Sequence, residues 1–126
     1  MVKNLTRLKI PAISWQKIKN KILSKDYELS LVFVSDKEMA RINLKYRGAT
    51  GPTDILAFLL AKNSGEIFID LPFASRKAGF LKKNIKERVL FLYIHALLHL
   101  KGFKHGTLHQ SKIMLKHEKK WLKILS

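Results

Sequence analysis

A histidine pattern near the C-terminal end constrains this chain more than any other feature. The segment reads His95-Ala-Leu-Leu-His99-Leu-Lys-Gly102-Phe-Lys-His105. On an α-helix, residues four apart share one face, so His95 and His99 can direct both imidazoles at one point. Gly102 suits the left-handed turn that ends a helix, after which His105 can reach the same point. Three such imidazoles leave the fourth tetrahedral position of a zinc ion open, as in catalytic sites.

The same histidines have a second interpretation, as ordinary residues of a buried helix. Positions 89–100 are apolar apart from the two histidines, which predicts a largely buried helix. Buried imidazoles without a metal need hydrogen-bond partners, and three close together would need many. The pattern therefore favours a metal site, with partnered core histidines as the alternative. His109 and His117 lie among polar residues and are expected on solvent-facing sides of a helix.

The length of the chain predicts one domain, residues 1–126, with enough apolar residues for a core. The chain has no cysteine, which excludes disulfides and thiolate metal sites and fits a reducing compartment. The first residues lack the apolar segment of a secretory signal, and the run 89–100 is too short to span a bilayer. We therefore expect a cytoplasmic protein without a membrane partner.

The charge of the chain is strongly unbalanced. Lysine and arginine total 25 against 9 acidic residues, a formal net charge of +16. Self-repulsion of this size opposes compaction, and a polyanionic partner relieves it, so nucleic acid is the first candidate. The alternative is a compositional bias toward lysine that serves solubility alone.

Periodicity and turn residues predict an α+β fold. Strands are expected over 6–10, 27–34, 54–60 and 66–70, the last two joined as a hairpin by a turn at 63–65. Helices are expected over 14–23, 35–46, 72–80, 84–101 and 107–125, with Ser35 and Thr107 among the capping residues. The expected core of the second and last helices comprises Met39, Ile42, Leu44, Leu108, Ile113, Met114, Trp121, Leu122 and Leu125. Together these elements predict an about four-stranded mixed sheet with helices packed on it.

Several short motifs, in the same order, resemble those of the YbeY endoribonuclease family of bacterial rRNA maturation factors. The histidine segment is similar to the zinc signature of that family. The other matching blocks are Asn43-Leu-Lys-Tyr46-Arg47-Gly48, Thr53-Asp54-Ile55-Leu56-Ala57-Phe58, Gly65-Glu66-Ile67-Phe68-Ile69, and the pair Met114 and Glu118. The resemblance covers residues 27–125, most of the chain.

The resemblance implies a zincin-like fold with the metal-site helix at its centre. It implies that His95, His99 and His105 hold one Zn²⁺ and that Arg47 is the basic residue of the catalytic site. The implied activity is single-strand-specific cleavage of RNA, in maturation of the 16S rRNA 3′ end and in ribosome quality control. The implied partners are rRNA and the ribosome or its small-subunit proteins, and the oligomeric state stays open.

Two residues depart from the family pattern. Ala96 replaces a glycine after the first histidine, a mild change that favours the helix. Lys104 replaces an aspartate before the third histidine. If that aspartate orients a ligand or water, its loss alters the surroundings of the metal. A cation there would either weaken metal binding or hold a phosphate.

The expected chemistry is attack of water on phosphorus. A zinc ion lowers the pKa of its water from about 16 toward 7 and polarises a phosphate oxygen. Arg47 is suited to clamp a phosphate with its planar guanidinium, although it could be one surface charge among many. Asp54 is either an acceptor for a histidine N–H or a turn cap. No carboxylate is tied by spacing to the histidines, so no general base is evident.

Two other functions compete with RNA cleavage. Metzincin peptidases share the histidine spacing but place a glutamate directly after the first histidine. Ala96 stands there and cannot transfer a proton, so a peptidase is disfavoured. A non-catalytic RNA- or ribosome-binding factor with a structural zinc remains the alternative, since a basic domain suits either role.

Overall fold

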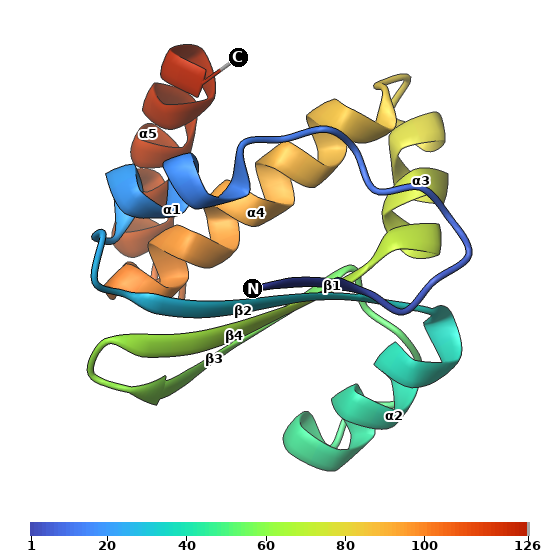
Figure 1. Cartoon of the computed structure of the whole chain (residues 1–126). Helices are drawn as coiled ribbons and strands as arrows, with labels where there is room; N and C mark the ends of the chain where they lie inside the picture. Colours follow the sequence, from blue (N-terminus) through green and yellow to red (C-terminus); the bar gives the residue numbers. More distant parts are fainter. Residues whose placement is uncertain (126) are drawn as a thin grey trace.

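The computed structural model describes residues 1–125. Four strands and five helices are present in that part of the chain (Figure 1). In order they are β1 (Val2–Asn4), α1 (Trp15–Ile22), β2 (Glu28–Val34), α2 (Asp36–Arg47), β3 (Ile55–Ala61), β4 (Ser64–Asp70), α3 (Leu71–Phe80), α4 (Ile85–Lys101) and α5 (Leu108–Leu125).

The four strands form one mixed sheet in the order β1-β2-β4-β3. β1 and β4 each run parallel to β2, whereas β3 and β4 form an antiparallel hairpin. Val32 lies opposite Phe68 in the parallel pair, and Leu56 lies opposite Phe68 in the hairpin. β3 is therefore a terminal strand, and its outer edge has no strand beside it among the described residues.

The sheet divides the apolar residues into two clusters because successive side chains of a strand point to opposite faces. Leu31 and Phe33 of β2 belong to the larger cluster with α1, α3, α4 and α5. Val32 and Val34 belong to the smaller one, which α2 covers with Met39 and Ile42. Figure 1 shows α2 below the sheet and the other helices above it. The α+β architecture and the mixed four-stranded sheet are confirmed.

The helix that carries His95 and His99 is α4, and it lies at the centre of the larger cluster. Asn84 and Glu87 form a reciprocal capping box at its start. Gly102 ends it with φ of 117°, in the region that favours glycine, as predicted. Even α4 lacks the length and apolarity to cross a membrane, and the same holds for every other helix within residues 1–125.

The prediction of a strand at 6–10 is wrong, because the first strand is Val2–Asn4. The side chain of Asn4 accepts hydrogen bonds from the backbone N–H and the hydroxyl of Thr6 and donates to the carbonyl of Leu8. These local bonds turn the chain, as asparagine side chains commonly do. The hairpin turn also lies earlier than predicted, at 62–63, so that β4 begins at Ser64.

Some predicted core residues face solvent instead. Leu44 is 60% exposed, and the buried residues of α2 are Met39, Ile42 and Asn43, which share a face at helical spacing. On α5, Leu108 and Ile113 are exposed, whereas Met114 is buried as predicted. Thr107 caps α5 through a reciprocal exchange of hydrogen bonds with Gln110. Ser35 accepts from the N–H of Glu38, as predicted, but the Glu38 carboxylate pairs with Arg41.

Candidate active site

One cavity of about 380 Å³ brings together the four residues that the sequence singled out. It lies between the second half of α4, the terminal strand β3 and the end of α2. Its lining comprises Arg47, Ile55, Leu56, Ala57, Phe58, His95, Ala96, His99 and His105. Three imidazoles and one guanidinium therefore face a common space.

Local helix geometry places the histidines. His95 and His99 are one turn apart on α4, and the backbone N–H of Phe103 bonds to the carbonyl of Leu98 as the chain turns back at Gly102. That turn carries His105 to the other two. Its ring centroid lies 5.6 Å from that of His95 and 5.9 Å from that of His99.

The cavity favours the neutral form of His99. Partial burial lowers the pKa of this imidazole, and the neighbouring His105 and His95 lower it further. A neutral imidazole has a lone pair free, which is the form that binds a metal ion. The electrostatics of the cavity and the requirement of a metal ligand therefore agree.

A buried carboxylate on α5 contacts His95, although the spacing of the sequence did not tie one to the histidines. Glu118 Oε2 lies 3.0 Å from His95 Nδ1, and Glu118 is only 6% exposed. An ionised carboxylate only accepts hydrogen bonds, so this contact suits a proton on Nδ1, and in the neutral tautomer that carries it the lone pair is on Nε2. Metal-binding histidines commonly donate to a carboxylate in this way. The sequence feature that could have indicated this buried carboxylate is the pair Met114 and Glu118, which lie one turn apart and are both buried.

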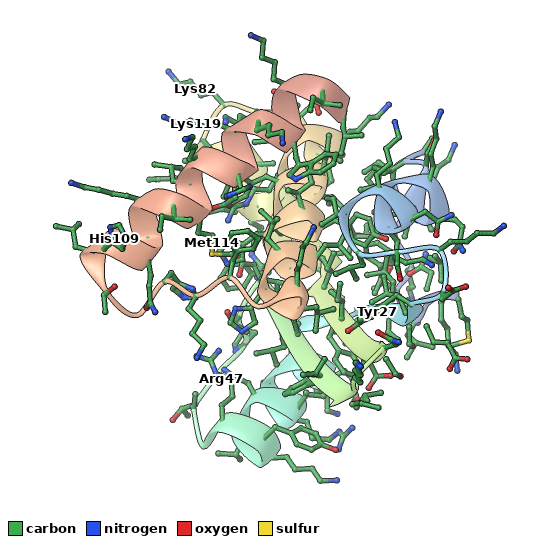
Figure 2. The ribbon with its side chains drawn as sticks, turned by 90° about the vertical axis from the view of Figure 1, so that its left-hand side faces the viewer. Tyr27, Arg47, Lys82, His109, Met114 and Lys119 are labelled. Atoms are coloured by element: carbon green, nitrogen blue, oxygen red, sulfur yellow. The ribbon has the colours of Figure 1, made fainter. Side chains whose placement is uncertain are left out.

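The end of α2 presents Arg47 to the cavity. Arg47 is the last residue of the helix, and Gly48 ends it with φ of 65°, its N–H bonding to the carbonyls of Asn43 and Leu44. The buried Asn43 side chain donates to the carbonyl of Gly51 at 2.9 Å and so holds the following loop against the helix. Figure 2 shows Arg47 at this end of α2, beneath the loop that joins α4 to α5.

Asp54 has a different partner from the histidine considered from the sequence. Its carboxylate accepts from Arg88 Nη2 at 2.8 Å, and both side chains are largely buried. Arg88 belongs to α4 and Asp54 directly precedes β3. This ion pair therefore joins α4 to the start of β3, and residues of both elements line the cavity.

The remaining residues of interest lie outside the cavity or on its wall. Lys104 is exposed and is not part of the lining, whereas Ala96 is. His109 is exposed, as predicted. The prediction for His117 is wrong, because it is half-buried against Phe103 with ring centroids 4.4 Å apart. This contact depends on how α5 packs against the turn after α4.

The three histidines suit a zinc ion by their chemistry, although their rings stand slightly apart. Within residues 1–125, no group of three or more His, Cys, Asp or Glu side chains is placed so that it could hold a metal ion. Zn–N distances near 2.0 Å in a tetrahedral site put imidazole centroids roughly 5 Å apart. The observed separations of 5.6 and 5.9 Å exceed this by less than about 1 Å. His95, His99 and His105 thus have the donor chemistry that zinc prefers, but their placement in this structure is not that of a metal site.

Fold and cavity together define a class: small basic α+β proteins with a tri-histidine cavity beside a terminal strand. The sequence matches the profile of the family described as Endoribonuclease YbeY over residues 3–126. This chain belongs to that family of endoribonucleases.

Individual relatives agree with this assignment. The chain is 35% identical to Endoribonuclease YbeY of Aster yellows witches'-broom phytoplasma, over 75% of this chain and 70% of that protein. It is 32% identical to the Mycoplasma capricolum protein of the same name, over 88% and 80%. The solution structure of TM1509 from Thermotoga maritima superposes with a TM-score of 0.67 at 26% identity, covering 98% of this chain and 87% of that one.

Proposed function

We propose that this chain is a zinc-dependent endoribonuclease that cleaves single-stranded RNA. The observation that supports this most directly is the cavity lined by three imidazoles and Arg47 in a member of an endoribonuclease family. RNA is the substrate class that the name of the family implies, and a net charge of +16 suits a polyanion.

Each residue of the cavity has a proposed part in the reaction. His95, His99 and His105 would hold one zinc ion, which supplies charge stabilisation at a phosphate and a more acidic attacking water. Arg47 binds a phosphate oxygen with its guanidinium and so positions the scissile bond. Glu118 holds the proton on Nδ1 of His95 and keeps its ring in one orientation. Positioning and charge stabilisation are the main requirements of phosphoryl transfer.

The biological setting is part of the same proposal. We propose action in the cytoplasm on rRNA, in maturation of the 16S rRNA 3′ end and in ribosome quality control, with the ribosome or its small-subunit proteins as partners. The membership of the family and the basic charge support this setting.

The decisive experiment measures cleavage and metal content together. We expect the full-length protein to cleave a single-stranded RNA but not the same RNA annealed to its complement. A chelator should abolish cleavage and added zinc should restore it. His99→Ala should remove both cleavage and bound metal, whereas His109→Ala, at an exposed histidine outside the cavity, should retain both. Cleavage that survives the chelator and His99→Ala would overturn the proposal.

Arg47→Gln separates phosphate binding from metal binding. We expect it to abolish cleavage while elemental analysis still finds one metal ion per chain. Loss of the metal together with cleavage would show that Arg47 supports the structure of the cavity instead.

A second candidate function is RNA or ribosome binding without cleavage, with a structural zinc. The observation that favours it is the lining of the cavity, which contains no carboxylate among the described residues and so offers no direct general base. Tight binding of single-stranded RNA by a metal-loaded protein that does not cleave it would select this candidate.

A further inference from the structure

A tyrosine beside the cavity exposes most of its ring. Tyr46 directly precedes Arg47 at the end of α2 and is 60% exposed. Its ring packs on Phe58, with centroids 5.3 Å apart and planes inclined at 54°. Phe58 in turn packs edge-on against Phe68 at 6.0 Å. The Tyr46 ring thus packs on an aromatic cluster and has Lys45 Nζ over it, and most of the side chain is otherwise open to solvent.

This aromatic cluster is continuous with the catalytic cavity, because Phe58 also lines it. The lining uses residues from both faces of β3: Ile55 and Ala57 pack with the α4 side, whereas Leu56 and Phe58 pack with the α2 side. The lining of the cavity therefore includes residues from both faces of this terminal strand. The histidines stand on one side of that strand, and Phe58 with Tyr46 on the other.

One cation lies over the exposed ring, and a second follows it in the sequence. Arg47 follows Tyr46 in the helix, where successive side chains diverge by about 100°. Lys45 Nζ lies 5.3 Å from the centroid of the Tyr46 ring. An exposed ring with one cation over it and Arg47 next to it in the helix provides a planar apolar surface for a base and positive charge for the adjoining phosphates. Leu44 lies on the same helix and is as exposed as Tyr46. Unlike Phe58, it belongs to neither of the core clusters.

We propose that Tyr46, supported by Phe58, is a stacking subsite for an unpaired nucleobase next to the phosphate that Arg47 binds. This inference rests on the proposed function and specifies its substrate. A base can stack on Tyr46 only when it has left its own helix, so the subsite selects single-stranded RNA. Stacking is tolerant of sequence because every base has a π-face.

Binding measurements separate stacking from charge. The protein is the full chain with His99→Ala, so that RNA is not consumed, and the probes are a short fluorescent single-stranded RNA and copies with one abasic position each. Tyr46→Ala should weaken binding of the intact RNA by roughly 5- to 150-fold. Tyr46→Phe should bind normally, because the ring and not the hydroxyl carries the contact. Leu44→Ala is the matched control and should also bind normally.

The abasic copies and salt dependence identify the contact. With the one RNA copy that lacks the base stacked on Tyr46, Tyr46→Ala should cause no further loss of affinity. The slope of log Kd against log salt should stay unchanged in Tyr46→Ala, since no charge is removed, but fall by about 0.7 in Arg47→Gln. An equal loss with every abasic copy, or normal binding of intact RNA by Tyr46→Ala, would overturn the subsite.

If Tyr46→Ala fails to fold, the fluorescence of a Tyr46→Trp variant provides a second test of stacking. Intact RNA should quench the added fluorescence of Tyr46→Trp, whereas inorganic polyphosphate, which has no bases, should not. Equal quenching by both polyanions would contradict stacking. These readouts need no cleavage. Base binding in these tests, combined with a metal-loaded wild-type protein that does not cleave the RNA, would refute the nuclease proposal and retain the base-binding site.

Discussion

Glu118 is an isolated buried acid on a helix rich in lysine. Removing a carboxylate from water costs free energy that only a close partner can offset, and the partner here is the Nδ1–H of His95. The contact holds the ring by its far nitrogen and leaves Nε2 available. In the proposed function, Glu118 would therefore act through His95 as a positioning residue.

Glu118→Gln tests this role with little change in side-chain volume. The amide cannot hold the Nδ1 proton as strongly as a carboxylate, so the affinity for zinc should fall by roughly 10- to 100-fold. Competition with a chromophoric chelator measures that affinity without a substrate. Glu28→Gln, at an exposed glutamate, is the control and should bind zinc as the wild type does. An unchanged affinity in Glu118→Gln would show that the contact serves packing alone.

The contrast between His99 and Glu118 shows what the sequence can predict about this site. His95, His99 and His105 lie close together because helix spacing and a glycine turn are local properties. Glu118 is 23 positions from His95, and only the packing of α5 on α4 joins them. The pairing of Asp54 with Arg88, 34 positions apart, was missed for the same reason.

The junction of β4 and α3 contains a second buried acid. Asp70 is the last residue of β4 and the N-cap of α3, where its Oδ1 accepts from the N–H of Phe73 at 3.0 Å. Its Oδ2 is buried and has no hydrogen-bond partner among the described residues. Burial, and then the neighbouring Asp36, raise the pKa of Asp70 to about 7. A proton on Oδ2 would supply the donor that the two carboxylates lack.

Asp70→Asn should therefore change how stability depends on pH. The raised pKa means that the folded protein binds more protons than the unfolded chain between about pH 4 and 7, so wild-type stability falls as the pH rises through this window. Asparagine keeps the capping acceptor and cannot ionise. Between about pH 5 and pH 8, the difference between the unfolding free energy of Asp70→Asn and that of the wild type should increase, in favour of the variant, by at least about 1 kcal/mol.

Urea denaturation at the two pH values measures this difference. Titration of Asp36 does not contribute to this difference. The pKa of Asp36 is lowered, chiefly by Arg76, so Asp36 titrates below this pH window. Asp26→Asn, at an exposed acid, should show no such trend. An Asp70→Asn variant that tracks the wild type at both pH values would place the Asp70 pKa near its ordinary value.

Helices and strands could be predicted from the sequence where the signal lies in neighbouring residues. They were harder to predict where long-range packing or side-chain hydrogen bonds determine the local structure. The β3–β4 hairpin follows from two strand-forming runs separated by turn residues, and the start of α4 follows from Asn84. The first strand was misplaced because the bonds of Asn4 turn the chain just where the apolar pattern continues. Leu44 was assigned to the core because hydrophobicity alone does not reveal that Asn43 holds the following loop.

The acidic residues and the lysines differ in whether they form ion pairs. Within residues 1–125, the acids in ion pairs contact arginine or histidine: Glu38 with Arg41, Asp36 with Arg76, Asp54 with Arg88 and Glu118 with His95. None of the described lysines forms an ion pair with an acid. The surface therefore keeps most of its lysine charge unneutralised; Figure 2 shows one such side chain, Lys119, on α5.

This unneutralised charge gives the last prediction, which separates an RNA-binding surface from a lysine bias that serves solubility. Each phosphate bound releases counterions and adds about −0.7 to the slope of log affinity against log salt for single strands. If the basic surface engages RNA around the cavity, three or more phosphates should be bound and the slope should be steeper than about −2. Fluorescence anisotropy with full-length His99→Ala protein, over a series of KCl concentrations, measures it. A slope no steeper than about −0.7 would mean that a single phosphate is bound, as Arg47 alone could do, and that the remaining charge has no part in binding RNA.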